Sequence, residues 1–117
     1  VFACDEIAEV LDKTGLSKQQ KDEILKIESE LSIIARQGRA FGIHLVLATQ
    51  RPDAAILNGQ IRNNIDTRIC GRADNVLSQI ILDNTDASDK IAKSSQGRFL
   101  TTSGKIFQAY WFDENIL

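Results

Sequence analysis

The chain has 117 residues, of which 43% are hydrophobic, so it is long enough to bury one core of modest extent. Its formal net charge of −2 gives no general basic field, which restricts any nucleic-acid contact to a local patch or to parts outside the sequence. No apolar run approaches the roughly 20 residues that a membrane span needs, and no signal peptide is visible.

The chain opens on a short apolar run, Val1–Cys4, which stops at the acidic pair Asp5-Glu6. A continuous run of this kind is typical of a strand that is buried on both faces in the centre of a parallel sheet. Because the run begins in mid-strand and without an initiator Met, we expect the sequence to have been cut from a longer protein.

A long amphipathic helix is predicted next. Residues 12–17 are typical of a loop around Gly15, and Ser17 with Gln20 has the capping-box spacing that opens a helix. One apolar stripe then recurs at three- and four-residue steps, and the helix is expected to end near residues 38–42. The stripe consists of Ile24, Ile27, Leu31, Ile34 and Ala35.

The rest of the chain alternates strands and helices, with polar residues before Pro52 at the end of the second strand. The predicted elements are a strand over 43–48, a helix over 56–64, a strand over 67–71 and a helix over 76–82, followed by an Asp- and Ser-rich turn. Residues 98–101 and 105–111 flank Ser103-Gly104, which is a two-residue hairpin signal. The sequence therefore predicts an α/β fold with a mostly parallel sheet and a C-terminal β-hairpin.

Polar groups directly after buried strands are the first candidates for a site, because ligands of open α/β sheets lie outside the carboxyl ends of the strands. Asp5 and Glu6 follow the first strand in the pattern of a Walker B segment. In that interpretation Asp5 holds magnesium through water, and Glu6 polarises the water that attacks the γ-phosphate. The alternative is a strand that ends in a solvated acidic turn.

A second polar cluster, Thr49-Gln50-Arg51, follows the next strand. A neutral amide at a strand end can donate to a γ-phosphate and accept from the attacking water, which suits Gln50 as a nucleotide sensor. Thr49 is assigned with it to nucleotide binding, and an ordinary polar turn is the alternative. If both clusters serve one nucleotide, Glu6 and Gln50 must lie at the same end of the sheet.

The string between these clusters, Arg36-Gln37-Gly38-Arg39-Ala40-Phe41-Gly42-Ile43-His44, makes the pattern recognisable. Together with the Asp-Glu pair and the segment Ala48–Pro52, it resembles the FtsK/SpoIIIE family of DNA translocases. The resemblance continues through residues 61–69, 78–83 and 97–99. It implies a partial RecA-like P-loop ATPase core, in which residues 1–117 form the C-terminal portion of a single ATPase domain. ATP and magnesium would be held between neighbouring subunits of a hexameric ring.

The resemblance also implies a role for one arginine. By position, Arg39 matches the arginine that such motors offer to the γ-phosphate of the next subunit, with Arg36 and Arg51 as weaker candidates. The alternative is that Arg39 only stabilises the C-terminus of a helix, through the favourable interaction of its charge with the helix dipole. For three further arginines two roles stay open, either as charges at the ends of the sheet or as parts of a nucleotide-sensing element. These residues are Arg62, Arg68 and Arg72.

Several other residues favour structural roles. His44, the only histidine, is expected to pack or to make a structural hydrogen bond. Cys4 and Cys70 are expected to be reduced and buried, as in a cytoplasmic protein. Four aromatic residues near the C-terminus are expected in the core rather than stacked on bases: Phe107, Tyr110, Trp111 and Phe112.

No Gly-x-x-x-x-Gly-Lys-Ser/Thr loop, the Walker A segment that binds the β- and γ-phosphates, occurs in these residues. We therefore expect the chain alone not to hydrolyse ATP, and its uncovered apolar edges to favour self-association. The resemblance implies a cytoplasmic parent, of a kind that is often tethered to the membrane by parts outside this sequence, that moves double-stranded DNA through a ring. Residues 71–83 are closest in pattern to members from conjugative elements. Two alternatives stay open: a type VII secretion motor, and a catalytically inactive half-domain that serves as an interaction surface.

Overall fold

The computed structural model describes residues 1–116, apart from the side chain of Ile116. The chain forms two compact units, Val1–Ile65 and Asp66–Leu117. No helix within residues 1–116 is long and apolar enough to cross a membrane. Both cysteines are free thiols, as predicted, although only Cys70 is buried and Cys4 is partly exposed.

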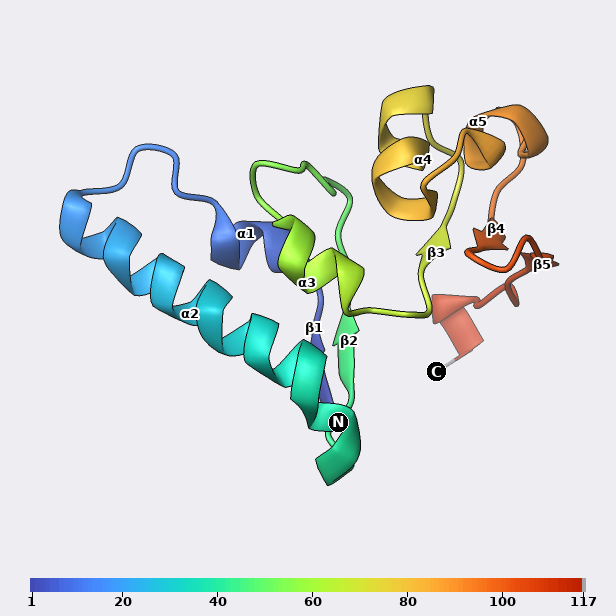
Figure 1. The fold of residues 1–117 in the computed structure, drawn as a ribbon. Helices are drawn as coiled ribbons and strands as arrows, with labels where there is room; N and C mark the ends of the chain where they lie inside the picture. The colour runs from blue at the N-terminus through green and yellow to red at the C-terminus, as the bar shows by residue number, and fades with distance from the viewer. Residues whose placement is uncertain (117) are drawn as a thin grey trace. The chain divides into compact units, whose positions relative to one another are not determined.

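The first unit is built around a pair of parallel strands (Figure 1). Its elements are β1 (Phe2–Cys4), α1 (Ile7–Leu11), α2 (Lys18–Gln37), the 3-10 helix η1 (Gly38–Phe41), β2 (Leu45–Leu47) and α3 (Gly59–Asn63). Phe2 pairs with Leu45 and Cys4 pairs with Leu47. Because the strands are parallel, their carboxyl ends lie at one edge of the pair.

The long helix α2 begins and ends where the sequence predicts. The Ser17 side chain accepts from the Gln20 N–H, and the Gln20 side chain accepts from the Ser17 N–H, so the capping box is confirmed. The loop before it turns at Gly15, which has a φ of 72°. The predicted stripe is shifted at one position, since Ile27 is 37% exposed while Glu28 is buried.

The core of the first unit lies between its helices and one face of the strand pair. It contains Ile7, Leu11, Leu31, Leu57 and Ile61, with Cys4, Leu45 and Leu47 packed against it from the strands. Successive strand residues point to opposite faces, so Val46 lies on the other face and is 55% exposed. The prediction of strands buried on both faces is therefore wrong for the described residues. The helices that pack on the pair cover only one of its faces.

Of the two roles expected for His44, packing is wrong, because its side chain is exposed. Its backbone carbonyl accepts from the Phe2 N–H at 2.9 Å and so extends the strand pairing by one bond. The structural contribution of His44 therefore comes from its main chain.

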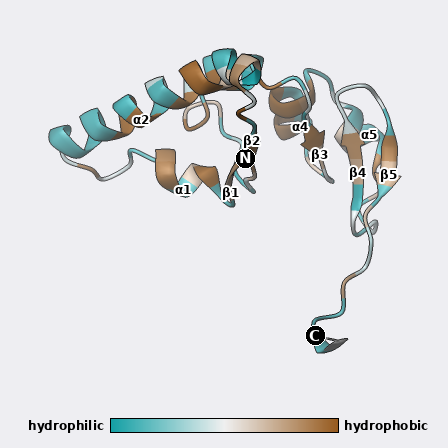
Figure 2. Ribbon diagram, turned by 90° about the horizontal axis from the view of Figure 1, so that it is seen from below, coloured by the Kyte–Doolittle hydropathy of each residue, from teal (hydrophilic) through white to brown (hydrophobic). Residues whose placement is uncertain are grey.

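The second unit is an antiparallel sheet with two short helices (Figures 1 and 2). Its elements are β3 (Ile69–Cys70), α4 (Asn75–Leu82), α5 (Asp86–Lys90), β4 (Arg98–Thr101), β5 (Ile106–Gln108) and the 3-10 helix η2 (Glu114–Ile116). The predicted third strand, β3, pairs antiparallel with β4 and does not extend the parallel pair. The apolar residues of α4 and β3, brown in Figure 2, contribute to a core of Cys70, Leu82, Ala87, Ile91 and Leu100.

The helix α5 occupies the segment that the sequence predicts as a turn. Its start is fixed by Ser78, a fully buried residue whose hydroxyl donates to the Asn84 carbonyl and accepts from the Ala87 N–H. At its end, the Arg72 guanidinium donates to the Ile91 carbonyl at 2.8 Å. These long-range bonds explain why an Asp- and Ser-rich segment forms a helix here.

The C-terminal hairpin is confirmed, with a longer turn than expected. The Thr101 N–H donates to Lys105 and the Gly104 N–H donates back to Thr101, so the loop also includes Thr102. Gly104 has a φ of 86°, the left-handed conformation that this type of loop needs at its last position. The strand register ends at Gln108, opposite Arg98, and one further bond follows it, from the Ala109 N–H to the Gly97 carbonyl at 2.7 Å.

The four aromatic residues near the C-terminus are exposed to different degrees, which corrects the prediction that they pack in the core. Phe107 stacks on Phe99 with a ring-centroid distance of 5.6 Å, although it stays partly exposed. Trp111 is 86% exposed, and Tyr110 and Phe112 are exposed as well. Tyr110, Trp111 and Phe112 follow the end of β5, where no residue of β4 is left to pair with them, so they do not become part of the sheet.

Candidate active site

The two polar clusters meet at one edge of the parallel pair. The Ala48 N–H donates to the Cys4 carbonyl at 3.0 Å, and the Ile7 N–H donates to the Ala48 carbonyl at 2.9 Å. The chain therefore leaves both strands side by side, with Glu6 next to Gln50. The expectation that these two residues lie at the same end of the sheet is confirmed.

Glu6 makes the central contacts of this edge. Although Glu6 is the N-cap residue of α1, its carboxylate accepts hydrogen bonds from the end of β2. The Thr49 hydroxyl donates to Oε1, and the Gln50 N–H donates to Oε2 at 3.0 Å. These two bonds, Thr49 first, lower the pKa of Glu6 below its ordinary value. Glu6 is therefore a carboxylate ion at neutral pH.

The backbone of Glu6 is also unusual, since its φ of 61° and ψ of 62° are left-handed. A residue with a Cβ adopts this conformation only when its surroundings require it. Here the turn carries the chain from β1 directly into α1, where the side chain of Ile7 is buried. Such positions cluster at functional sites, which agrees with the placement of Glu6.

Asp5 lies beside Glu6 and is exposed at the same edge. Among residues 1–116 no group of three or more His, Cys, Asp or Glu side chains could hold a metal by itself. Magnesium at nucleotide sites takes one or two protein carboxylates, and phosphates and water supply its other ligands. A single exposed carboxylate at the end of β1 fits that donor set.

Comparison with known proteins gives a consistent result, although no family model matches the chain. DNA translocase FtsK 2 of Ralstonia nicotianae is 38% identical over 88 residues, which are 74% of this chain and 10% of the relative. DNA translocase FtsK 2 of Neisseria meningitidis serogroup A is 35% identical over 94 residues, 80% of this chain and 8% of the relative. The solved pCW3 conjugation coupling protein TcpA, in a monomer form with ATPγS, has a TM-score of 0.86 and 42% identity over 97% of this chain.

The chain belongs to the FtsK/SpoIIIE family. It spans about a tenth of the length of these two curated relatives and 33% of the TcpA chain. The α/β fold class, with a parallel strand pair and a C-terminal antiparallel sheet, is confirmed by the structural match.

Arg39 of this FtsK/SpoIIIE-family chain lies away from the acidic pair. It is exposed on η1, which precedes β2, whereas Gln50 follows β2. With a rise of about 3.3 Å per strand residue, β2 separates the two edges by about 10 Å. Arg39 and Glu6 of one chain therefore do not converge on a common point.

Arg51 lies at the candidate site but is held by two acidic residues that the sequence interpretation missed. Its guanidinium pairs with Glu9, and its Nη1 lies 3.9 Å from Asp12 Oδ2. Glu9 follows Glu6 by three residues, so only the turn into α1 brings it to the β2 end. Because these pairs hold Arg51 within its own chain, Arg51 is a weaker candidate for the arginine that contacts the γ-phosphate of a neighbouring subunit.

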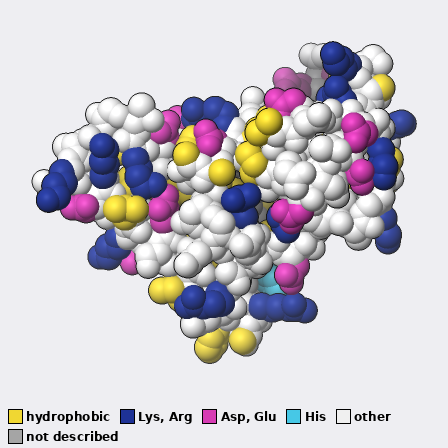
Figure 3. Space-filling model, turned by 45° about the horizontal axis from the view of Figure 1, so that its top comes forward, with side chains coloured by type: hydrophobic (Ala, Val, Ile, Leu, Met, Phe, Trp, Pro, Cys, Tyr) yellow, Lys and Arg dark blue, Asp and Glu magenta, His cyan; other side chains and the backbone are white. Residues whose placement is uncertain are grey.

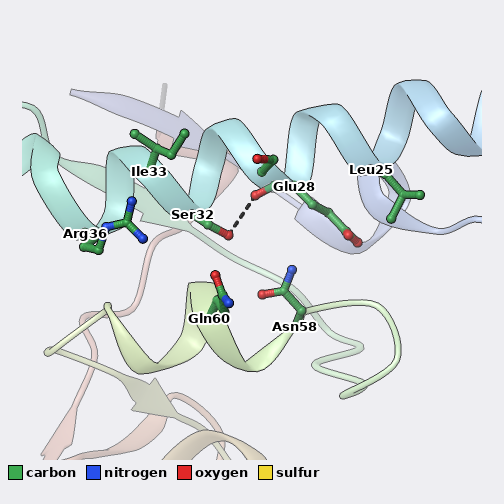
Figure 4. Close-up of a pocket in the computed structure, with 8 residues that line it drawn as sticks. Leu25, Glu28, Ser32, Ile33, Arg36, Asn58 and Gln60 are labelled. Carbon is green, nitrogen blue, oxygen red and sulfur yellow. Dashed lines mark hydrogen bonds between the residues drawn. The ribbon is translucent and has the colours of Figure 1, made fainter.

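Arg36 lies elsewhere, in a groove between α2 and α3 (Figure 4). The groove has a volume of about 400 Å³, and Asn58 and Gln60 of the α3 segment face α2 across it. Inside it, the Ser32 hydroxyl donates to the Glu28 carbonyl. The lining of the groove is mainly polar, and neither Glu6 nor Gln50 belongs to it.

The three arginines with open roles each make hydrogen bonds within their own unit. Arg62 Nε donates to the Leu57 carbonyl at 3.1 Å. Arg68 pairs with Asp83 at 3.0 Å, and Arg72 binds the end of α5. On the face shown in Figure 3, Lys and Arg side chains are interspersed with Asp and Glu, in keeping with the net charge.

Proposed function

We propose that this chain is the hydrolysis portion of an ATP-driven motor that moves double-stranded DNA during conjugative transfer. The observation that carries this proposal is the juxtaposition of Glu6 and Gln50 at the carboxyl ends of two parallel strands. The names of the similar proteins, two DNA translocases and a conjugation coupling protein, support the substrate and the process.

In this proposal Glu6 and Gln50 act on the γ-phosphate of ATP. The ionised Glu6 carboxylate retains lone pairs that can accept from a water molecule and orient it for attack. The exposed Gln50 amide can donate to a phosphate oxygen and accept from the same water. Asp5 would hold magnesium, which neutralises charge on the phosphate oxygens when bound.

Arg39 is proposed to act on the nucleotide of a neighbouring subunit in a hexameric ring. Its place at the edge opposite Glu6 supports this role, because an arginine there cannot serve the γ-phosphate of its own chain. A trans arginine finger contributes roughly 10³ to 10⁵ in rate in enzymes that use one. Mixing Arg39→Ala subunits with Walker A-defective subunits should therefore restore some ATPase activity. Failure to restore activity at any ratio would remove Arg39 from this role.

The remaining parts of the motor are proposed to lie outside these residues. The phosphate-binding loop is not in the sequence, so the 117-residue chain is expected to be inactive until that loop is supplied. The parent is proposed to be cytoplasmic, with any membrane tether elsewhere. The exposed face around Val46 is a candidate surface for self-association or for cover by other parts of the parent.

The test of the function is ATP hydrolysis by the full-length protein with Glu6→Gln. This substitution keeps the side-chain shape and removes the charge, so turnover should fall by at least two orders of magnitude while nucleotide binding persists. Glu23→Gln, at an exposed position on α2, is the matched control and should retain the parent rate. Equal rates for Glu6→Gln and the parent protein would refute the proposed site.

A further inference from the structure

We propose that Thr49 is a positioning residue that holds the Glu6 carboxylate in the orientation needed to activate water. The inference rests on the proposed function and assigns to Thr49 a hydrogen bond to the base, where the sequence suggested direct nucleotide binding. The Thr49 hydroxyl lies between the two strand ends and contacts Glu6 directly.

The hydroxyl has a defined direction. Its oxygen accepts from the Arg51 N–H at 2.9 Å, which occupies one of its lone pairs. Glu6 is ionised and can only accept, so the Thr49 proton must point toward Oε1. The bond is therefore charge-assisted, which makes it stronger than a bond between two neutral groups.

The Glu6 carboxylate is held at two points, because the Gln50 N–H donates to its second oxygen. Two bonds to two oxygens fix both the rotamer and the plane of the carboxylate, and each oxygen keeps a lone pair for water. The backbone of Glu6 is already fixed by its left-handed turn. The orientation of the Glu6 carboxylate thus depends on Thr49 and Gln50, the two residues that donate to it after β2.

This arrangement also links the base to the proposed sensor. The Gln50 side chain is available to a nucleotide, while the Gln50 main chain and the adjacent Thr49 hydroxyl hold Glu6. A shift of this dipeptide when a γ-phosphate binds would therefore be transmitted to Glu6 through two hydrogen bonds. Thr49 acts through Glu6 and not on the phosphate.

The test compares Thr49→Val and Thr49→Ser in the full-length protein, with kcat and KM for ATP measured separately. Val keeps the shape of threonine and removes the hydroxyl, whereas Ser keeps the hydroxyl and removes the methyl group. Thr49→Val should lower kcat by about tenfold or more with KM for ATP unchanged, because it loosens a base that acts in the transition state. Thr49→Ser should recover most of the rate.

The split between kcat and KM, together with the rescue by Thr49→Ser, separates positioning of the base from a general loss of structure, which would also raise KM for ATP. If Thr49→Val does not fold, Thr49→Ala compared with Thr49→Ser gives the same contrast. The inference is overturned if Thr49→Val is as fast as or faster than the parent protein, or if Thr49→Ser is equally slow. A slow Glu6→Gln beside a normal Thr49→Val would refute this inference alone, and a normal Glu6→Gln would refute the proposed function.

Discussion

Gly38 joins α2 to η1 and sets the position of Arg39, and the substitution Gly38→Ala tests this junction. Its φ of −60° and ψ of −31° are helical, so the backbone conformation by itself would accept any residue. Space is the constraint: an added Cβ would lie 3.2 Å from Ile43 Cβ, 3.3 Å from Ile34 Cγ2 and 3.3 Å from the Ile43 carbonyl oxygen. Ile43 cannot easily retreat, because its N–H donates to the Gly38 carbonyl at 2.9 Å.

Two opposing effects decide whether Gly38→Ala raises or lowers the free energy of unfolding. Replacing glycine by alanine at a compatible helical position stabilises a protein by about 0.4–1 kcal/mol. Overpacking a close contact destabilises it by about 1–3 kcal/mol. We therefore expect Gly38→Ala to lower the free energy of unfolding by about 1 kcal/mol.

Gly59→Ala is the matched control for the same chemical change. Gly59 is the first residue of α3, and its added Cβ would meet only side-chain atoms of Arg62 and Asn63, at 3.8 and 3.9 Å. That variant should be as stable as the parent chain or more stable by up to about 1 kcal/mol. Urea unfolding followed by far-ultraviolet circular dichroism measures both. A Gly38→Ala variant at least as stable as Gly59→Ala would contradict the close approach of η1 and Ile43.

Three further predictions concern packing, capping and pH. Ile61 is fully buried in the core of the first unit, so Ile61→Ala should lower the unfolding free energy by about 2–5 kcal/mol and Ile61→Val by about 1 kcal/mol, in the same urea assay. Ser17→Ala removes the capping box of α2 and should destabilise the unit by about 1 kcal/mol, whereas Ser29→Ala on the exposed side of that helix should change stability by less than about 0.5 kcal/mol. The folded-state pKa values of Glu6 and Asp12 are both lowered, Asp12 mainly by bonds from Thr14. Their contribution is therefore present above the ordinary values of 4.5 and 3.8 and is lost as pH falls through the lowered ones. Unfolding measured against pH should show this loss, and Glu6→Gln should make it shallower.

The position of the site could be predicted from the sequence because it depends on a local rule. Apolar runs that stop at polar residues mark strand ends, and parallel pairing brings such ends together. That rule placed Glu6 beside Gln50. The bond from Thr49 to Glu6 could not be predicted, because it depends on the register of β1 against β2 and on the left-handed turn at Glu6.

The elements that could not be predicted depend on contacts between segments that are distant in the sequence. The helices α1 and α5 have five residues each, too few for a periodic pattern, and tertiary contacts of Ile7 and Ser78 stabilise them. The burial of the strands was overestimated because Val46 is as apolar as its neighbours although it is exposed. An apolar run does not show whether other elements cover one face of a strand or both. The pairing of β3 with β4 depends on chain topology rather than on local composition.

A structure of the full-length protein with ATPγS and magnesium tests the convergence of the two strand ends most directly. The Glu6 carboxylate and the Gln50 amide should both lie within about 3 Å of the γ-phosphate or of its attacking water. A γ-phosphate bound instead at the opposite edge of the parallel pair, beside Arg39 of the same chain, would contradict the assignment.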